Sequence, residues 1–170
     1  MTLAASNGTL AAHVHVEGFE RFHRDSFNKR QVRTAMRKAG RLVENRVKLN
    51  LALAGSGSNY PRKLRGVLRD SIKTRVSRSG FLVKIMPDKT AGMAEYYPAY
   101  LHYGVKQGGR IKGTGGKRRA KGQRQSLIAA RKAGGWRIAP RDNYVADGLE
   151  DETSSVRAVL SAGFRRALGG

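Results

Sequence analysis

Two alternating histidines are the residues whose types and spacing come nearest to a catalytic or metal site. His13 and His15 fall on one face of a predicted strand, where two imidazoles could begin a metal site. A metal needs further ligands, and no cluster of Asp, Glu and His at recognisable spacing accompanies this pair. The other candidate ligands stand alone in the sequence: Glu17, Glu20, His23 and His102. We therefore expect an exposed strand and no metal site.

A glycine-rich segment from Gly113 to Lys117 has some likeness to a phosphate-binding loop. That motif requires Ser or Thr after its lysine and an apolar strand before its glycines. Arg118 follows Lys117 here, and no apolar strand leads into the segment. No serine nucleophile motif and no paired acid–base carboxylates stand out either. The sequence therefore predicts a protein that is not an enzyme and has no cofactor.

The basic residues around this segment have the clearest physical consequence. No acidic residue occurs from Tyr96 to Arg141, and glycines disfavour regular structure in the first half of the segment. The cations expected to contact DNA or a neighbouring subunit are Lys106, Arg110, Lys112, Lys117, Arg118, Arg119, Lys121 and Arg124. On a flexible loop, such cations neutralise phosphates without reading bases, and their affinity falls as salt rises. Contact with DNA and docking on an acidic subunit are equally favoured.

Two further groups are candidates for a subunit interface. Tyr97, Tyr100 and Tyr103 lie in a segment that is too apolar for an ordinary surface loop. Packing in the core is the simpler interpretation, and an intersubunit contact, where tyrosine is enriched, is the alternative. The second group is the acidic start of the last predicted helix, which could face the basic first helix or the basic loop of a neighbour: Asp147, Glu150, Asp151 and Glu152.

The overall charge agrees with a polyanionic or acidic partner. The 170 residues include 34 Lys and Arg against 12 Asp and Glu, which gives a net charge of +22 at pH 7. A field of this size favours nucleic acid, an acidic protein surface or an anionic membrane. No apolar run reaches the roughly 18 residues that a bilayer span requires, so we expect no membrane partner. The absence of cysteine excludes disulfides and thiolate metal sites.

Hydrophobic periodicity predicts the elements that must position these residues. In chain order they are a strand over 10–19, a helix from Asp25 or Ser26 to about Leu53, a helical turn from Leu64, hairpin strands at Ile72–Ser77 and Phe81–Met86, an aromatic segment at Met93–Val105, a short helix at 125–133, a strand-like stretch at 136–140 and a helix from Asp142 or Asn143 to about Leu168. The first long helix has its apolar residues on one stripe, namely Val32, Ala35, Met36, Ala39, Leu42, Val43, Val47 and Leu51.

This order predicts an α+β fold in which two long helices pack on a small, mainly antiparallel sheet, with a long basic Gly-rich loop. We expect a flexible N-terminus at 1–9. A single domain would follow at 10–170, with the basic loop inserted at 106–135.

Three short motifs resemble, in their order and spacing, those of the neck and tail-completion proteins, which join head to tail in long-tailed bacteriophages. Gly66–Ile72 fits the family's G-x-L-R-x-S-I turn, which follows a basic amphipathic helix. Tyr97–Val105 fits its Y-A-x-x-x-E-x-G-T pattern, with His102 and Val105 in place of the acid and the threonine. Ala139–Val145 opens the last helix where the family has P-R-P and an aromatic residue. The resemblance covers residues 20–168.

The resemblance implies a structural virion protein, made in the host cytoplasm, that forms a ring of identical subunits around the DNA channel at the head–tail junction. A hexamer is preferred, and a dodecamer is the alternative. Its neighbours would be connector proteins and tail-tube or terminator proteins, with sequence-independent contact to packaged DNA. A tail terminator and a head-side adaptor ring are alternatives at the same junction. The alternative of another class is a non-specific nucleic-acid-binding protein.

Overall fold

The computed structural model describes residues 2–5, 10–16, 28–55, 59–61, 66–107 and 123–168, with the backbone alone at 2–5, 123, 124 and 127. The chain divides into two compact units. A large unit comprises residues 1–88 and 143–170, and a small unit comprises residues 89–142. We expected one domain with an insertion at 106–135, whereas the structure separates a longer stretch as a unit of its own.

The large unit contains an antiparallel sheet with strand order β1-β2-β4-β3. Its strands are β1 (Thr2–Ala5), β2 (Ala12–His15), β3 (Ile72–Val76) and β4 (Leu82–Pro87). The predicted hairpin is confirmed as β3 and β4, in which Val76 pairs with Val83. The predicted first strand is confirmed as β2, and the part of it beyond residue 16 lies outside the described residues. Strand β1 falls in the N-terminus that was expected to be flexible, and it pairs along its whole length with β2.

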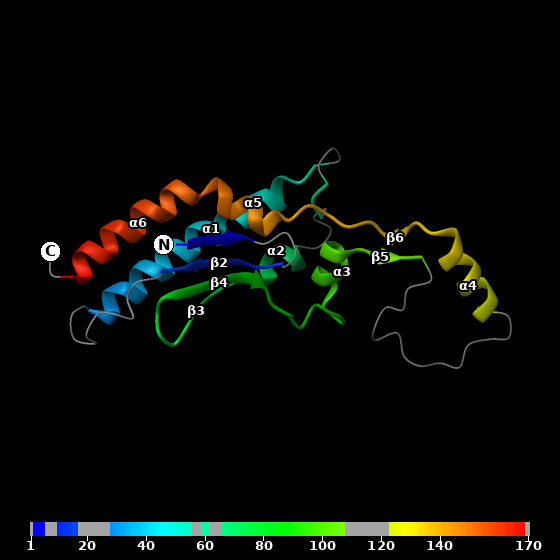
Figure 1. Ribbon diagram of the computed structural model, residues 1–170, viewed down its shortest axis with the longest axis horizontal. Coiled ribbons are helices and arrows are strands. Elements are labelled where there is room, and N and C mark those ends of the chain that lie inside the picture. The colour runs from blue at the N-terminus through cyan, green and yellow to red at the C-terminus, as the bar shows by residue number, and fades with distance from the viewer. Residues whose placement is uncertain are drawn as a thin grey trace. The chain divides into compact units, whose positions relative to one another are not determined.

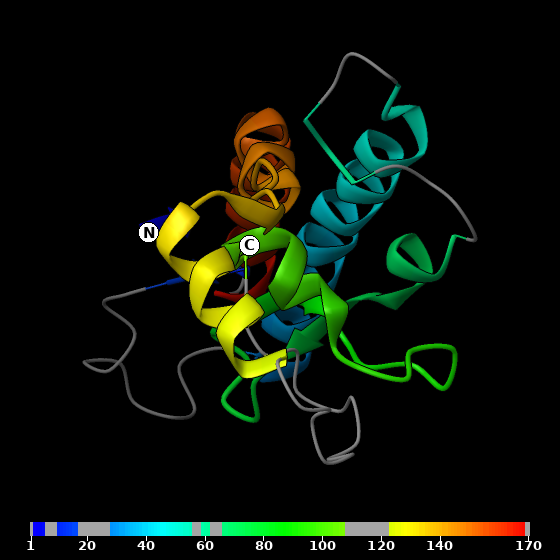
Figure 2. The same cartoon turned by 90° about the vertical axis from the view of Figure 1, so that its right-hand side faces the viewer.

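Helices cover one face of this sheet (Figure 1; Figure 2). Helix α1 (Lys29–Leu53) packs on β3 and β4, α5 (Tyr144–Asp151) reaches β1 and β2, and α6 (Thr153–Ala167) packs along α1. The predicted helical turn is α2 (Val67–Ser71), which leads directly into β3. The predicted fold class, with long helices packed on a small antiparallel sheet, is therefore confirmed.

Helix α1 begins at a cap that the sequence interpretation misplaced. The side chain of Asn28 accepts hydrogen bonds from the backbone N–H groups of Arg30 and Gln31, so that two free donors of the first turn are satisfied. The expected start at Asp25 or Ser26 is replaced by this cap, and those two residues lie outside the described part of the chain. The predicted apolar stripe of α1 is buried except at Leu42, which is partly exposed.

The last predicted helix is two helices, which is a correction to the sequence interpretation. Asn143 caps α5 by accepting a hydrogen bond of 3.2 Å from the backbone N–H of Ala146. The helical path then breaks at Glu152, where ψ is 8°. Next to the break, the hydroxyl of Thr153 donates to the carbonyl of Leu149 at 2.9 Å. Such a bond from a side chain to the preceding turn competes with the hydrogen bonds of the helix and bends it. The apolar periodicity of the sequence continues across Glu152, but the helix itself is interrupted there.

Close backbone approach holds the layers of the large unit together. A Cβ atom at Gly40 of α1 would lie 2.8 Å from Val83 on β4, and it would also overlap the side chain of Thr74 on β3. The same crowding occurs between α5 and α1, where a Cβ at Gly148 would meet Val47. Among the described residues, the largest fully buried side chains include Tyr144, Met36, Ile72, Ile85 and Leu160. No helix in the described ranges is long and apolar enough to cross a membrane.

The small unit contains two helices and a two-stranded sheet. Its elements are α3 (Tyr97–Tyr103), β5 (Val105–Lys106), α4 (Gln123–Ala133) and β6 (Trp136–Ile138). Strands β5 and β6 pair antiparallel, and the backbone N–H of Arg141 donates to the carbonyl of Leu101 at 2.7 Å. Gly104 connects α3 to β5 at a φ of 70°, which favours glycine. The helix predicted at 125–133 is confirmed as α4.

Candidate nucleic-acid and subunit interfaces

Most of the predicted basic loop lies outside the described residues. Lys106 is exposed on β5, with its ammonium group 5.8 Å from the centroid of the Trp136 ring, within cation–π range. Arg124 lies in α4, but its side chain is not described. The remaining six candidates fall at 108–122: Arg110, Lys112, Lys117, Arg118, Arg119 and Lys121. The segment compared with a phosphate loop lies there too.

The three candidate tyrosines differ in exposure. Tyr97 is partly buried, and burial raises the pKa of its hydroxyl. Tyr100 is also partly buried, whereas Tyr103 is 57% exposed and stacks edge-on against the ring of His102 at 4.7 Å between centroids. Core packing therefore suits Tyr97 and Tyr100 better than Tyr103. Tyr103 remains the one of the three whose ring is accessible to another molecule.

Two of the four acidic candidates are engaged within the large unit. Asp147 accepts a hydrogen bond of 2.5 Å from the hydroxyl of Tyr60. Asp151 accepts one from Arg46 at 2.9 Å, and this bond, with a second from Asn50, lowers its pKa. These contacts fasten α5 to α1 and to the segment after it.

The other two acidic candidates, Glu150 and Glu152, lie next to this anchored pair. Glu150 is exposed and Glu152 is partly exposed, at the junction of α5 and α6. Of the predicted acidic set, these two carboxylates are therefore best placed for an outside partner.

The histidine pair lies on the sheet face opposite the helices. His13 and His15 are half-buried, and His13 pairs in register with Lys84 of β4, which itself pairs with Arg75 of β3. Burial lowers the pKa of His13, and the charge of Lys84 lowers it further. Within the described ranges, no group of three or more His, Asp and Glu side chains is placed to hold a metal ion. Burial and the neighbouring charge of Lys84 instead disfavour protonation of the His13 imidazole.

A groove of about 840 Å³ lies between the first half of α1 and α6. Small apolar residues form part of its lining, namely Ala35, Ala158, Val159, Ala162 and Gly163, beside the polar Asn28, Gln31 and Thr34. Three cations lie among its lining residues: Arg30 and Lys38 from α1 and Arg166 from α6. This combination of small apolar residues with cations suits an acidic, partly apolar element of another chain.

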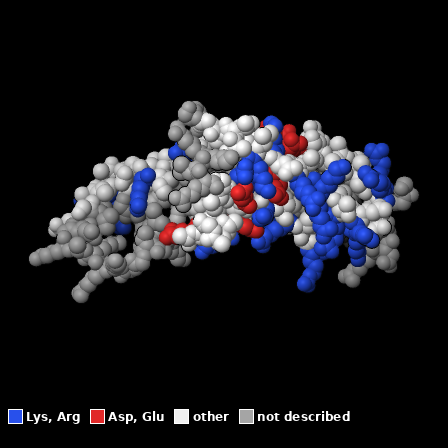
Figure 3. Space-filling model, turned by 180° about the vertical axis from the view of Figure 1, so that it is seen from behind, with Lys and Arg blue, Asp and Glu red and all other residues white. Residues whose placement is uncertain are grey.

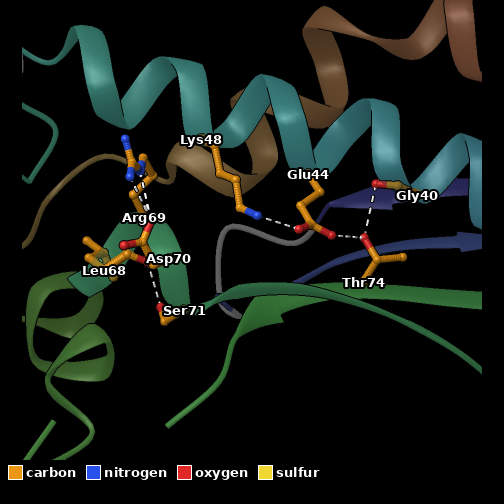
Figure 4. A network of polar contacts seen from close by, with 8 residues as sticks. All are labelled: Gly40, Glu44, Lys48, Leu68, Arg69, Asp70, Ser71 and Thr74. Carbon is orange, nitrogen blue, oxygen red and sulfur yellow. Dashed lines mark hydrogen bonds and ion pairs between the residues drawn. The ribbon is translucent and has the colours of Figure 1, made fainter. Parts of the chain in front are cut away.

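A second groove, of about 380 Å³, lies between α1 and the edge strand β3. Arg37 and Arg41 line it from α1, and Lys73 lines it from β3. Its carboxylate, Glu44, accepts hydrogen bonds from Thr74 at 2.7 Å and from Lys48 at 2.5 Å (Figure 4). Burial opposes ionisation of Glu44, but these two donors outweigh it and lower its pKa. Glu44 is thus an ionised carboxylate that already has its partners.

Sequence reasoning identified the first helix as basic, but it did not single out the cations of this second groove. Arg33, Arg37 and Arg41 recur at four-residue intervals and therefore follow one face of α1. Figure 3 shows Lys and Arg side chains gathered over the end of the large unit that holds the first half of α1. The interval was visible in the sequence, but the approach of Lys73 from β3 depends on the tertiary fold.

Comparisons of the chain with protein-family models, curated proteins and solved structures found no match.

Proposed function

We propose that this chain is a structural subunit of a ring at the head–tail junction of a long-tailed bacteriophage, where it joins head to tail around the DNA channel. The observation that carries the proposal is the order of the folded elements around the three sequence motifs. A basic amphipathic helix, a short turn, a hairpin, an aromatic helix and a C-terminal helical segment follow one another as α1, α2, β3–β4, α3 and α5–α6. That is the order which the resemblance implies.

Each motif has a local structural role that is compatible with the proposal. Gly66 adopts a φ of 72° before α2, and the hydroxyl of Ser71 donates to the carbonyl of Leu68 at 2.6 Å, which fixes the turn into β3. In the small unit, the bond from Arg141 to Leu101 connects the second motif to the start of the third. The contact between Arg141 and Leu101 joins two motifs that are distant in the sequence.

A ring of identical subunits needs two different, complementary patches on each subunit. We assign one to the groove between α1 and α6, with its cations Arg30, Lys38 and Arg166. The other is the α5–α6 junction of the neighbouring copy, which offers Glu150 and Glu152. Opposite charges at such an interface select the register and suppress wrong partners. The ring would serve as a neck ring, with a tail terminator or a head-side adaptor ring as the alternatives.

Charge reversal with rescue tests this arrangement. The double variant Glu150→Lys/Glu152→Lys should shift the protein from closed rings toward monomers in native mass spectrometry. Adding Arg30→Glu and Lys38→Glu should restore the rings, because the attraction returns with its polarity exchanged. Asp70→Lys/Glu95→Lys makes the same change in net charge elsewhere and should leave the rings intact. Rings that persist in the first variant would contradict the assigned interface, and a wild-type protein that stays monomeric would contradict the ring itself.

The second candidate function is sequence-independent binding of nucleic acid by a single subunit. The net charge of +22 favours it. Salt-sensitive binding of free duplex by a protein that forms no rings would support this second function over the first.

A further inference from the structure

Two arginines and a lysine line the groove between α1 and β3, and a third arginine lies one turn earlier on α1. The arginine strip consists of these four residues, Arg33, Arg37 and Arg41 on α1 together with Lys73 on β3. Successive arginines are one helical turn apart, or about 6 Å along the axis, since four residues rise about 1.5 Å each. The stem of Arg33 packs over the turn between β3 and β4, where a Cβ at Gly80 would lie 2.6 Å from its Cγ. The strip is therefore supported by both the helix and the hairpin.

The strip is not neutralised by the acidic residues that the structure describes. Some other cations of the large unit have carboxylate partners: Arg46 pairs with Asp151, Arg75 with Asp88 and Lys48 with Glu44.

Arg37, Arg41 and Lys73 have no such partner in the described part of the chain. The Nε atom of Arg33 is buried, and no hydrogen-bond acceptor lies within reach among the described residues. Like charges four residues apart on a helix repel one another. A bound anion would relieve this repulsion.

Glu44 does not supply the missing negative charge. Its two oxygens accept from Thr74 and Lys48, so the carboxylate serves to join β3 to α1. The groove thus presents three cations against one carboxylate that Lys48 already balances. Its net charge favours an anion with several charges in a row.

We propose that the arginine strip binds the phosphate backbone of duplex DNA. Guanidinium groups bind phosphate oxygens through two parallel hydrogen bonds, which an ammonium group cannot do. The spacing of about 6 Å between successive arginines is close to two phosphate intervals of one DNA strand, which carries a phosphate about every 3.4 Å of its axis. Contacts from these cations to phosphate oxygens carry no sequence information directly. Binding should therefore be independent of base sequence.

This inference deepens the proposed function by naming the surface of the subunit that meets packaged DNA. It rests on that proposal only for the place of the contact, because phosphate binding by the purified protein is measurable whether or not rings form. The predicted contact through the basic loop at 106–135 is a different prediction that concerns other residues. Its residues from 108 to 122 lie outside the described chain.

The test measures binding of a fluorescein-labelled duplex of mixed sequence by full-length protein over a series of salt concentrations. The strip variant is Arg37→Gln/Arg41→Gln/Lys73→Gln. The control variant, Arg157→Gln/Arg165→Gln/Lys84→Gln, removes the same charge from exposed positions outside the groove. We expect the slope of log affinity against log salt to fall by about 3 in the strip variant, at about 0.9 per lost phosphate contact. The control should lose less than about one unit of slope.

Three outcomes would overturn the inference. The first is a strip variant that binds duplex like the wild type, and the second is an equal loss in both variants, which would mean diffuse attraction by net charge. The third is a strip variant that loses binding to poly-glutamate but keeps its binding to duplex, which would assign the strip to an acidic protein. Circular dichroism of both variants shows whether the fold is retained. Native mass spectrometry of the same samples reports ring formation separately, so failure of the strip is distinguishable from failure of the ring.

Discussion

The hydroxyl of Thr74 on β3 donates a hydrogen bond of 2.7 Å to a carboxylate oxygen of Glu44 on α1 (Figure 4). The same oxygen of Thr74 lies 3.2 Å from the carbonyl of Gly40, one turn earlier on the helix. This contact joins the edge strand to the long helix directly beside the arginine strip. Loss of the hydroxyl should therefore affect both stability and the position of Lys73.

Replacing Thr74 by Val keeps the shape of the side chain and removes its donor. We expect a loss of about 1 to 2 kcal/mol in the free energy of unfolding, because a partly buried carboxylate loses a hydrogen bond. Urea denaturation followed by circular dichroism measures it. Thr34→Val is the matched control, because the hydroxyl of Thr34 is exposed and donates only to its own helix at Arg30. Equal losses in the two variants would contradict the role given to the contact between Thr74 and Glu44.

Replacing Gly40 by Ala should destabilise the protein, although alanine is the better helix former. The new methyl group would overlap Thr74 and Val83, and overpacking of a filled core costs about 1 to 3 kcal/mol. The helix-propensity gain of up to about 1 kcal/mol offsets only part of this cost. Gly55→Ala is the control, since the nearest atom to its Cβ, among the described residues beyond its chain neighbours, is 4.0 Å away. A more stable Gly40→Ala variant in thermal denaturation would disprove the close approach of α1 to the sheet.

Acid should remove stability that depends on Glu44. In the folded chain its pKa lies below the usual 4.5, so its ionisation stabilises the fold above that pH. This contribution disappears as pH falls from about 4.5 through the lower folded pKa. The stability gap between wild type and Glu44→Gln, measured by urea denaturation, should therefore be larger at about pH 6 than at about pH 3.

The control for the pH dependence is Glu95→Gln, which lies in the small unit and is not part of the proposed subunit interface. Its gap to the wild type should change little over the same range. A Glu44→Gln gap that stayed constant with pH would show that Glu44 does not contribute through its charge.

Replacing Gly104 by Ala should disrupt the small unit locally. Gly104 has a φ of 70°, and its added Cβ would lie 2.7 Å from the ring of Trp136 and 3.0 Å from the carbonyl of Ile138. Gly134→Ala is a matched control, because its φ is 72° but, among the described residues beyond its chain neighbours, no atom lies within 4 Å of the new Cβ. Both variants incur the left-handed strain of roughly 1 to 2 kcal/mol, and only Gly104→Ala adds the steric overlap.

Hydrogen exchange at β5 and β6 measures the effect, and Trp136 fluorescence gives a second signal, since it is the only tryptophan of the chain. Faster exchange in Gly104→Ala than in Gly134→Ala is expected. Equal exchange in the two variants would show that Trp136 does not pack over Gly104.

The fold class and most elements could be predicted from the sequence because they depend on local periodicity. The stripe from Val32 to Leu51 determines α1, and the alternation around Val83 and Ile85 determines β4. Two predicted helix boundaries were wrong. Several polar residues near the start of α1 could cap it, and the cap is Asn28 rather than Asp25 or Ser26. The last predicted helix breaks at Glu152, although the apolar pattern of the sequence continues across that position.

Strand β1 and the arginine strip could not be predicted because each depends on partners far along the chain. Thr2–Ala5 has no clear pattern of its own and becomes a strand by pairing with β2. The sequence shows that the helix carrying Arg37 and Arg41 is basic, but the groove exists only because the fold brings Lys73 beside them. The acidic candidates also depend on the tertiary fold. The sequence alone does not distinguish Asp151, which pairs with Arg46, from its neighbour Glu150, which is exposed.

Electron microscopy of phage particles assembled with and without this chain tests the central claim most directly. If the chain forms the joining ring, its loss should leave DNA-filled heads and finished tails as separate objects, and adding purified wild-type protein should join them. Particles with tails attached in the normal position, assembled in its absence, would contradict the proposed function.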